Sequence, residues 1–162
     1  MNLKEKLEKR VFSLVGATAD SLGRECYVVG GYVRDLIIGR SSKDIDFVTV
    51  GSGIELAEAV AAAIGPKTHI AVYRTYGTAQ VHDRDLELEF VGARKESYRR
   101  DSRNPIVEDG TLTDDLSRRD FTINAMAVSV NGDSFGELID MFGGMEDIER
   151  RIIRTPLDPD IT

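Results

Sequence analysis

Two aspartates, Asp44 and Asp46, stand one residue apart inside DIDFVTV, a stretch that otherwise has the composition of a buried β-strand. Because side chains alternate between the two faces of a strand, both carboxylates are expected on one face, with Ile45 and Phe47 on the other. Two ionised carboxylates at this spacing repel each other unless a cation or water lies between them. Carboxylate oxygens are ligands that suit Mg²⁺. The pair is a candidate magnesium site, and a solvent-facing edge strand is the alternative.

A third acid strengthens the magnesium interpretation. Glu87 and Glu89 alternate in the same way within LELEFVG, which is a second strand candidate. One face of a sheet could therefore present Asp44, Asp46 and one of the two glutamates together. Three convergent acids suit two-metal phosphoryl or nucleotidyl transfer, in which the ions activate the attacking oxygen and stabilise the leaving one.

Gly30 and Gly31 lie between ECYVV, which predicts a short strand, and YVRDLIIG, which predicts a short helix. Backbone N–H groups at a helix N-terminus can bind a triphosphate when no side chain obstructs them. Arg34, one turn into that helix, would add a cation at the same end. The alternatives are a simple tight turn and pairing of Arg34 with an aspartate. The chain contains neither GxGxxG nor GxxxxGK[ST].

The segment RRDFTINAMAV places two arginines and an aspartate directly before an apolar run. Arg119 and Asp120 could lie against the phosphates and ribose of a nucleotide. They could equally form a helix cap with surface arginines, and the spacing of the residues leaves both interpretations open.

The elements that must position these residues follow from hydrophobic periodicity. Apolar residues at helical spacing predict an amphipathic helix over the first twenty or so residues, and a second long helix begins at Ser52 and ends at Gly65-Pro66. A hairpin is expected around residues 83–85, and residues 92–117 are predicted to form a long polar loop. Asn131-Gly132 predicts a hairpin turn toward a strand in SFGELIDMF, and residues 145–150 predict a short helix.

Composition limits the class of protein. With 162 residues and 41% apolar composition, the chain is long enough for one domain with a core. The net charge of −7 argues against a surface that grips nucleic acid throughout, although arginine is dense from Arg94 to Arg103 and at Arg118 and Arg119. Cys26 is the only cysteine, and a zinc site built on His69 and His82 is not expected. No apolar run is long enough for a membrane span, which favours a cytoplasmic protein.

Taken in order, the motifs resemble the head domain of class II tRNA nucleotidyltransferases and bacterial poly(A) polymerases, within the DNA polymerase beta superfamily. The matching segments are GGYVRDLIIGR, DIDF, LELEFVGAR, RRDFTINAMA and DMFGGMEDIERRIIRT. The resemblance implies an α+β nucleotidyltransferase fold, with a mainly antiparallel mixed sheet and helices packed on one side. It also implies that residues 1–162 are the catalytic head and that the helical neck, body and tail lie outside this chain.

The same resemblance implies roles for individual residues. Asp44 and Asp46 would bind two Mg²⁺ ions, and Glu89 would be the third acid, ahead of Glu87. Triphosphate contacts would come from the Gly-Gly turn and Arg34, and nucleotide contacts from the RRDFTIN segment. The nucleotide-binding set is Gly30, Gly31, Arg34, Arg119, Asp120 and Asn124.

The implied reaction is attack of an RNA 3′-hydroxyl on the α-phosphate of CTP or ATP without a template, giving CCA at a tRNA 3′ end. A poly(A) polymerase and an enzyme that adds only A or only CC share these head motifs, and a non-catalytic nucleotide-binding module is the alternative from another class. In the family a Glu-Asp-x-x-Arg motif of the neck selects the base. EDIER, residues 146–150, matches its letters but stands at the end of the head, so it is interpreted as a chance match.

Overall fold

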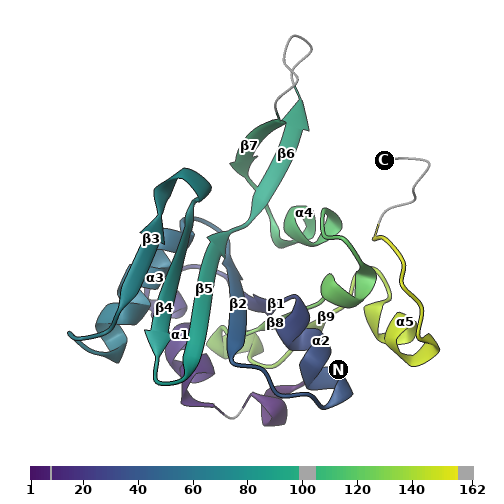
Figure 1. Cartoon of the computed structure of the whole chain (residues 1–162), viewed down its shortest axis with the longest axis horizontal. Coiled ribbons are helices and arrows are strands. Elements are labelled where there is room, and N and C mark those ends of the chain that lie inside the picture. The colour runs from purple at the N-terminus through teal and green to yellow at the C-terminus, as the bar shows by residue number, and fades with distance from the viewer. Residues whose placement is uncertain (8, 99–104, 157–162) are drawn as a thin grey trace.

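The structure is a computed structural model, and it describes residues 1–7, 9–98 and 105–156. It is an α+β fold built on one seven-stranded sheet with a separate two-stranded hairpin (Figure 1). Strand order in the large sheet is β3-β4-β5-β2-β1-β8-β9. Among the described strands of this sheet only β2 and β5 pair in parallel, and the other neighbours are antiparallel. The predicted fold class, a mainly antiparallel mixed sheet, is confirmed.

The strands of the large sheet are Cys26–Val29 (β1), Asp44–Thr49 (β2), Ile70–Tyr73 (β3), Thr78–Asp83 (β4), Leu86–Gly92 (β5), Ala127–Ser129 (β8) and Leu138–Ile139 (β9). The hairpin strands are Arg94–Tyr98 (β6) and Pro105–Asp109 (β7). The α-helices are Arg10–Ser21 (α1), Gly31–Ile38 (α2), Gly53–Ile64 (α3), Leu112–Ser117 (α4) and Gly144–Arg150 (α5). Short 3₁₀ helices are Lys4–Lys6 (η1), Arg74–Tyr76 (η2), Thr122–Asn124 (η3) and Gly132–Ser134 (η4).

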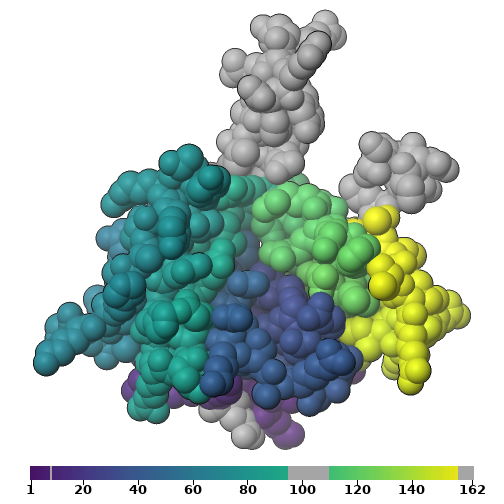
Figure 2. Space-filling view, in the orientation of Figure 1, coloured from purple at the N-terminus to yellow at the C-terminus, as the bar shows by residue number. Residues whose placement is uncertain are grey.

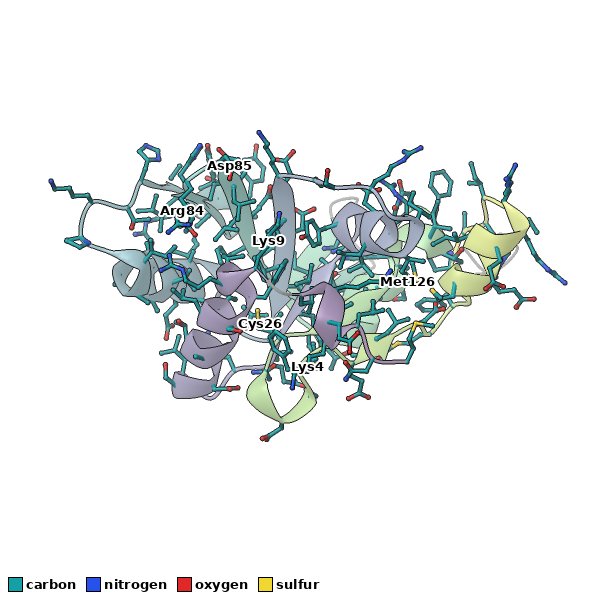
Figure 3. The ribbon with its side chains drawn as sticks, turned by 90° about the horizontal axis from the view of Figure 1, so that it is seen from below. Lys4, Lys9, Cys26, Arg84, Asp85 and Met126 are labelled. Carbon is teal, nitrogen blue, oxygen red and sulfur yellow. The ribbon has the colours of Figure 1, made fainter. Side chains whose placement is uncertain are left out.

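The main core lies between the sheet and the helices behind it. Helices α1 and α3 cover the rear face of the sheet in Figure 1, and α2 contributes Tyr32 and Val33 to the same core. Phe47 of β2 and Phe90 of β5 stack with ring centroids 5.0 Å apart. Cys26 and Met126, both fully buried, lie in the interior of the molecule in Figure 3.

The opposite face of the sheet is only partly covered. Leu112 and Leu116 of α4 pack with Val29 and Val48 in a smaller cluster on that face. The expectation of helices on one side is therefore met by α1, α2 and α3, and α4 adds a small second layer. The rest of this face stays open beside α4.

Several element boundaries follow from local chemistry that the sequence indicates. Gly30 precedes α2 with a φ of 74°, a conformation that glycine adopts without a steric penalty. The Ser52 side chain accepts a hydrogen bond from the Glu55 backbone N–H at 3.1 Å and so caps α3, as predicted. The predicted hairpin at residues 83–85 joins β4 and β5, and Figure 3 shows Arg84 and Asp85 at its tip.

The predicted helix over the first twenty residues is wrong in extent. The structure contains η1 and then α1 from Arg10 onward. Asn2 forms a bridge with Glu137, and the Leu3 N–H donates to the Gly136 carbonyl oxygen at 2.6 Å. These bonds attach the N-terminal residues to the segment before β9, so the backbone there is not available for a continuous helix.

The long polar loop predicted over residues 92–117 is also wrong, because the described part of this segment contains β6, β7 and α4. The β6–β7 hairpin extends away from the sheet in Figure 1, and pairing of two strands needs no apolar periodicity. Thr111 and Asp114 form a capping box that begins α4. Three arginines of the basic stretch, Arg99, Arg100 and Arg103, lie outside the described residues.

The partner strand predicted in SFGELIDMF is confirmed as β9, but the hairpin turn predicted at Asn131-Gly132 is wrong. β8 does pair with β9, but η4 and further residues separate them, and β9 has only two residues. The Asn131 side chain accepts a hydrogen bond from the Cys26 N–H and donates to the Arg24 carbonyl oxygen, each at 2.8 Å. It therefore holds the end of β8 against β1. The short helix predicted at 145–150 is confirmed as α5.

No helix in the described residues has the length and apolar character needed to cross a membrane.

Replacing Gly16 by alanine tests the contact between α1 and the sheet. In an exposed helix this change stabilises by about 1 kcal/mol. Here a β-carbon would lie 1.9 Å from the Val130 carbonyl oxygen, so we expect a net loss of about 1–3 kcal/mol in the free energy of unfolding. Urea denaturation measures it. Ser13→Ala, on the exposed side of α1, is the control and should leave stability unchanged or slightly higher. Equal stabilities of the two variants would contradict the packing described.

Candidate active site

Four carboxylates lie on the open face of the sheet because of the register between β2 and β5. Asp44 pairs with Glu87 and Asp46 with Glu89, so each acid of one strand lies beside an acid of its neighbour. The intervening Ile45, Phe47, Leu88 and Phe90 are fully buried on the other face. Asp44, Asp46, Glu87 and Glu89, together with Gln80 of β4, line a pocket of about 300 Å³. The predicted alternation of both acid pairs is confirmed.

The surroundings of Asp46 raise its proton affinity. The pKa of the Asp46 carboxyl is raised above its ordinary value, first by burial and then by the charge of Glu89, with a smaller contribution from Asp44. The Arg119 guanidinium acts in the opposite direction and lowers it. A bound cation would do the same more strongly, since it favours the ionised carboxylate. The pocket is therefore electrostatically suited to a positive ion.

The Gly30-Gly31 turn brings the cationic side of the site to the acids. A β-carbon on Gly30 would lie 3.3 Å from Arg119 Nη1 and 3.8 Å from Asp46 Oδ2. One on Gly31 would lie 3.2 Å from Arg34 Nη2. Both glycines thus leave the first turn of α2 open between two guanidinium groups, which is an arrangement that can bind phosphate oxygens.

A chain of hydrogen bonds joins the other predicted nucleotide-binding residues. Arg34 Nη1 donates to Asn124 Oδ1 at 2.9 Å, and Asn124 Nδ2 donates to Asp120 Oδ1 at 3.3 Å. Arg34 Nε also donates to Asp35 Oδ1 at 3.2 Å, so the alternative pairing of Arg34 with an aspartate is present as well. Asn124 still binds the Nη1 end of the same guanidinium group. The structure therefore brings every predicted site residue to one region, around α2, η3 and the acidic face.

Asp115 of α4 is a site residue that the sequence interpretation missed. Its carboxylate is completely buried and binds two arginines, Arg118 Nη2 at 3.2 Å and Arg119 Nη2 at 3.0 Å. A carboxylate three and four residues before two arginines on a helix is a recognisable signal for such pairing. Because α4 packs on Val29 and Val48, Asp115 fixes where Arg119 lies relative to Asp46.

Two further polar residues of β4 border the acids and were also missed. Gln80 pairs with Glu89 on the adjacent strand β5, and His82 Nδ1 lies 2.7 Å from Glu87 Oε1. The His82 and His69 rings meet edge to face with centroids 6.1 Å apart. Glu87 is thus engaged by His82, whereas Glu89 remains beside Asp46.

The residues present fit magnesium in the manner usual for nucleotide-dependent enzymes. Within the described ranges no group of three or more His, Cys, Asp or Glu side chains is arranged to hold a metal ion by itself. Magnesium commonly takes one or two carboxylates and completes its shell with water and substrate phosphates. Asp44 and Asp46 supply two carboxylates on one face, next to the open turn of α2.

The EDIER segment lies away from this pocket. It forms most of α5, where Glu146 Oε1 and Arg150 Nε lie 3.5 Å apart and both side chains are largely exposed. The space-filling view shows α5 at the far side of α4 from the hollow between β5 and α4 (Figure 2).

Comparison with known proteins identifies relatives over most of the chain. Residues 26–154 match the family model described as the poly A polymerase head domain. An A-adding tRNA nucleotidyltransferase of Aquifex aeolicus is 48% identical over 128 residues, which are 79% of this chain and 15% of the relative. A CCA-adding enzyme of Anoxybacillus flavithermus is 40% identical, covering 85% of this chain and 32% of that protein. A CC-adding tRNA nucleotidyltransferase of Deinococcus radiodurans is 40% identical, covering 80% and 34%. The chain therefore spans about a third or less of the length of these relatives.

Solved structures agree with the sequence comparison. A CCA-adding enzyme in an apo form superposes with a TM-score of 0.86 at 34% identity, covering 97% of this chain and 38% of that one. A tRNA nucleotidyltransferase complexed with a primer tRNA and an incoming ATP analogue superposes with a TM-score of 0.76 at 42% identity, covering 88% and 39%.

The effect of Glu89 on Asp46 can be tested by metal binding. Asp46 must lose its proton to bind Mg²⁺, so affinity should fall as the pH drops through its raised pKa. Glu89→Gln removes one cause of that shift, and we expect the midpoint of the fall to move to lower pH. Calorimetric titration with Mg²⁺ across pH measures the midpoint. Glu87→Gln is the control, because Glu87 is not among the groups that raise this pKa. The same midpoint in both variants would contradict the described coupling.

Asp115→Asn tests the anchoring of Arg119. Losing a charge-assisted hydrogen bond should weaken binding of ATP with Mg²⁺ about tenfold, because the guanidinium is no longer held beside Gly30. Fluorescence titration of the folded protein measures the dissociation constant, and a melting curve measures stability separately. Asp133→Asn, an exposed residue of η4, is the matched control. A lower melting temperature with unchanged ATP affinity would show that Asp115 serves stability alone.

Proposed function

Because the chain belongs to the poly A polymerase head-domain family, we propose that residues 1–162 form the catalytic head of a template-independent nucleotidyltransferase acting on tRNA 3′ ends. One observation carries this proposal. The register of β2 and β5 places Asp44, Asp46 and Glu89 together on an open face, next to an unobstructed helix N-terminus and two guanidinium groups. A binding module would not need three acids at this position.

The reaction is attack of an RNA 3′-hydroxyl on the α-phosphate of a nucleoside triphosphate, with release of pyrophosphate. Asp44 and Asp46 would hold two Mg²⁺ ions, which lower the pKa of the attacking hydroxyl and stabilise charge on the leaving oxygen. Glu89, beside Asp46, completes the negative side of the site on the strand farther from the triphosphate.

The remaining residues bind and orient the nucleotide. Free N–H groups of α2 and the guanidinium groups of Arg34 and Arg119 would bind the triphosphate. Asn124 holds Arg34 in place and Asp120 holds Asn124, so these two residues position the cation and lie where the sugar would enter. Burial of Asp115 keeps Arg119 paired in the absence of nucleotide.

CTP and ATP are the proposed donors and the tRNA 3′ end the proposed acceptor. Relatives that carry this head are named for addition of A, of CC and of CCA, and the solved relatives include complexes with tRNA, an ATP analogue or CTP. Addition of A alone is a second candidate, because three A-adding enzymes are among the most similar relatives, at 48%, 40% and 37% identity. The sequence of the product distinguishes the two, since A addition requires an acceptor that already ends in CC.

Nucleotide addition by the chain and its variants tests the proposal. With Mg²⁺, labelled CTP or ATP and tRNA lacking its 3′ end, we expect extension products on a sequencing gel. Their rate should be low and their base selectivity weak, because residues 1–162 do not include the neck, body and tail that the family uses for base selection and tRNA binding. Asp44→Asn and Asp46→Asn should lower the rate at least about a hundredfold, because each removes a metal ligand in the transition state. Glu58→Gln, on the exposed side of α3 behind the sheet, is the control and should retain activity within a few-fold. Product formation that needs no Mg²⁺, or that is unchanged in Asp44→Asn and Asp46→Asn, would refute the proposed function.

A further inference from the structure

The open face of the sheet continues past the acids to the edge strand β3. Strand pairing defines rows across this face. Gln80 and Ala71 continue the row of Asp46 and Glu89. The next row runs from Val48 through Val91 and Thr78 to Tyr73. Tyr73 therefore lies on the same face as the carboxylates, two strands from Glu89 and one row further along. Two strand spacings amount to roughly 10 Å.

This edge exposes aromatic and basic side chains. Tyr73 is 45% exposed and Tyr76 is 67% exposed, and they flank Arg74, which is also exposed. None of these three side chains forms a hydrogen bond or ion pair with another described residue, whereas the buried Tyr27 of β1 is hydrogen-bonded to Glu25. Exposed tyrosines beside arginines are the composition of surfaces that stack the bases of single-stranded nucleic acid.

A second arginine borders the same edge. Gly77 follows Tyr76 and adopts a φ of 67°, and a β-carbon on it would lie 3.4 Å from Arg94 Nη2. Arg94, the first residue of β6, thus lies over the η2 turn between β3 and β4. Figure 1 shows this turn close to the base of the β6–β7 hairpin. Positive charge at this edge contrasts with the net charge of −7 of the whole chain.

The chemistry of nucleotidyl transfer decides which ligand reaches this edge. Attack at phosphorus takes place in line with the leaving group. The groups that would bind the departing pyrophosphate, Gly30, Arg34 and Arg119, lie on the β1 and α2 side of the acids. The attacking hydroxyl must enter from the opposite side, which is over β5, β4 and β3.

From this geometry we propose that Tyr73 is a stacking platform for the single-stranded 3′ end of the acceptor RNA, with Arg74 and Arg94 binding its phosphates. The proposal rests on the proposed function for the direction from which the acceptor enters. Stacking on a tyrosine does not depend on the identity of the base, so this site would tolerate an acceptor whose terminal base changes as it grows.

Binding of a short single-stranded RNA with 2-aminopurine at its 3′ end tests the proposal without requiring catalysis. Stacking on Tyr73 should quench the fluorescence when the full chain is added. Tyr73→Ala should abolish the quenching and weaken binding about fivefold to a hundredfold, the range for loss of one base–aromatic stack, whereas Tyr73→Phe should retain both. Leu22→Ala is the matched control, because Leu22 is 37% exposed at the end of α1, behind the sheet. Unchanged quenching by Tyr73→Ala, or an equal loss in the control, would overturn the proposal.

Kinetics separate this proposal from the proposed function. If the wild-type chain adds nucleotides, Tyr73→Ala should raise KM for RNA and leave KM for ATP within about twofold, because ATP binds on the other side of the acids. A rise in KM for ATP alone would overturn the acceptor assignment. If product formation does not depend on Mg²⁺, Asp44 and Asp46, the proposed function fails, and the quenching experiment still decides whether RNA stacks on Tyr73. Dimerisation that Tyr73→Ala abolishes, seen by sedimentation, with no quenching of RNA, would instead assign this edge to a second copy of the chain.

Discussion

Parallel pairing of β2 with β5 is the constraint on which the rest of the site depends. Alternation along each strand buries Ile45, Phe47, Leu88 and Phe90 against the helices, and the same alternation sends Asp44, Asp46, Glu87 and Glu89 to the open face. The apolar residues cannot keep their places in the core unless the acids are brought together. Burial of Asp46 and its repulsion from Glu89, which together raise the pKa of Asp46, are a cost that the buried face of the same two strands offsets.

The cationic half of the site is built from parts that are individually weak in the sequence. Arg119 reaches Gly30 because Asp115, fully buried in a helix of six residues, holds its guanidinium from behind. Arg34 lies over Gly31 because Asn124 accepts its outer N–H. Each arginine is thus ordered before a ligand arrives, which lowers the entropic cost of binding phosphate. Asp115 sets the position of the Arg119 guanidinium, and Asp120 sets that of Arg34 through Asn124. The two guanidinium groups lie opposite the carboxylates of β2 and β5.

Much of the fold follows from the sequence because local chemistry and burial agree. Ser52, the Gly30-Gly31 turn and the period-2 pattern of β2 and β5 each specify one local structure, and the structure confirms them. Two of the incorrect expectations share one cause, which is a partner distant in the sequence, and the third concerns a local hairpin that the apolar pattern does not reveal. Asn2 and Leu3 bond to the segment before β9, Asn131 bonds to β1, and the β6–β7 hairpin pairs its strands without an apolar pattern.

The sequence by itself determined which side chains could share a face and which residue types could bind metal and phosphate, because strand alternation and helix starts are local properties. It could not show that Asp46 lies beside Glu89 or that a buried Asp115 orients Arg119. Nor could it show that His82 contacts Glu87, which leaves Glu89 as the glutamate beside the metal-binding pair. Those relations arise from strand order and from the packing of α4 on the sheet. Tertiary structure alone also placed Tyr73 on the face that carries the acids, because β3 reaches that face only through its pairing with β4.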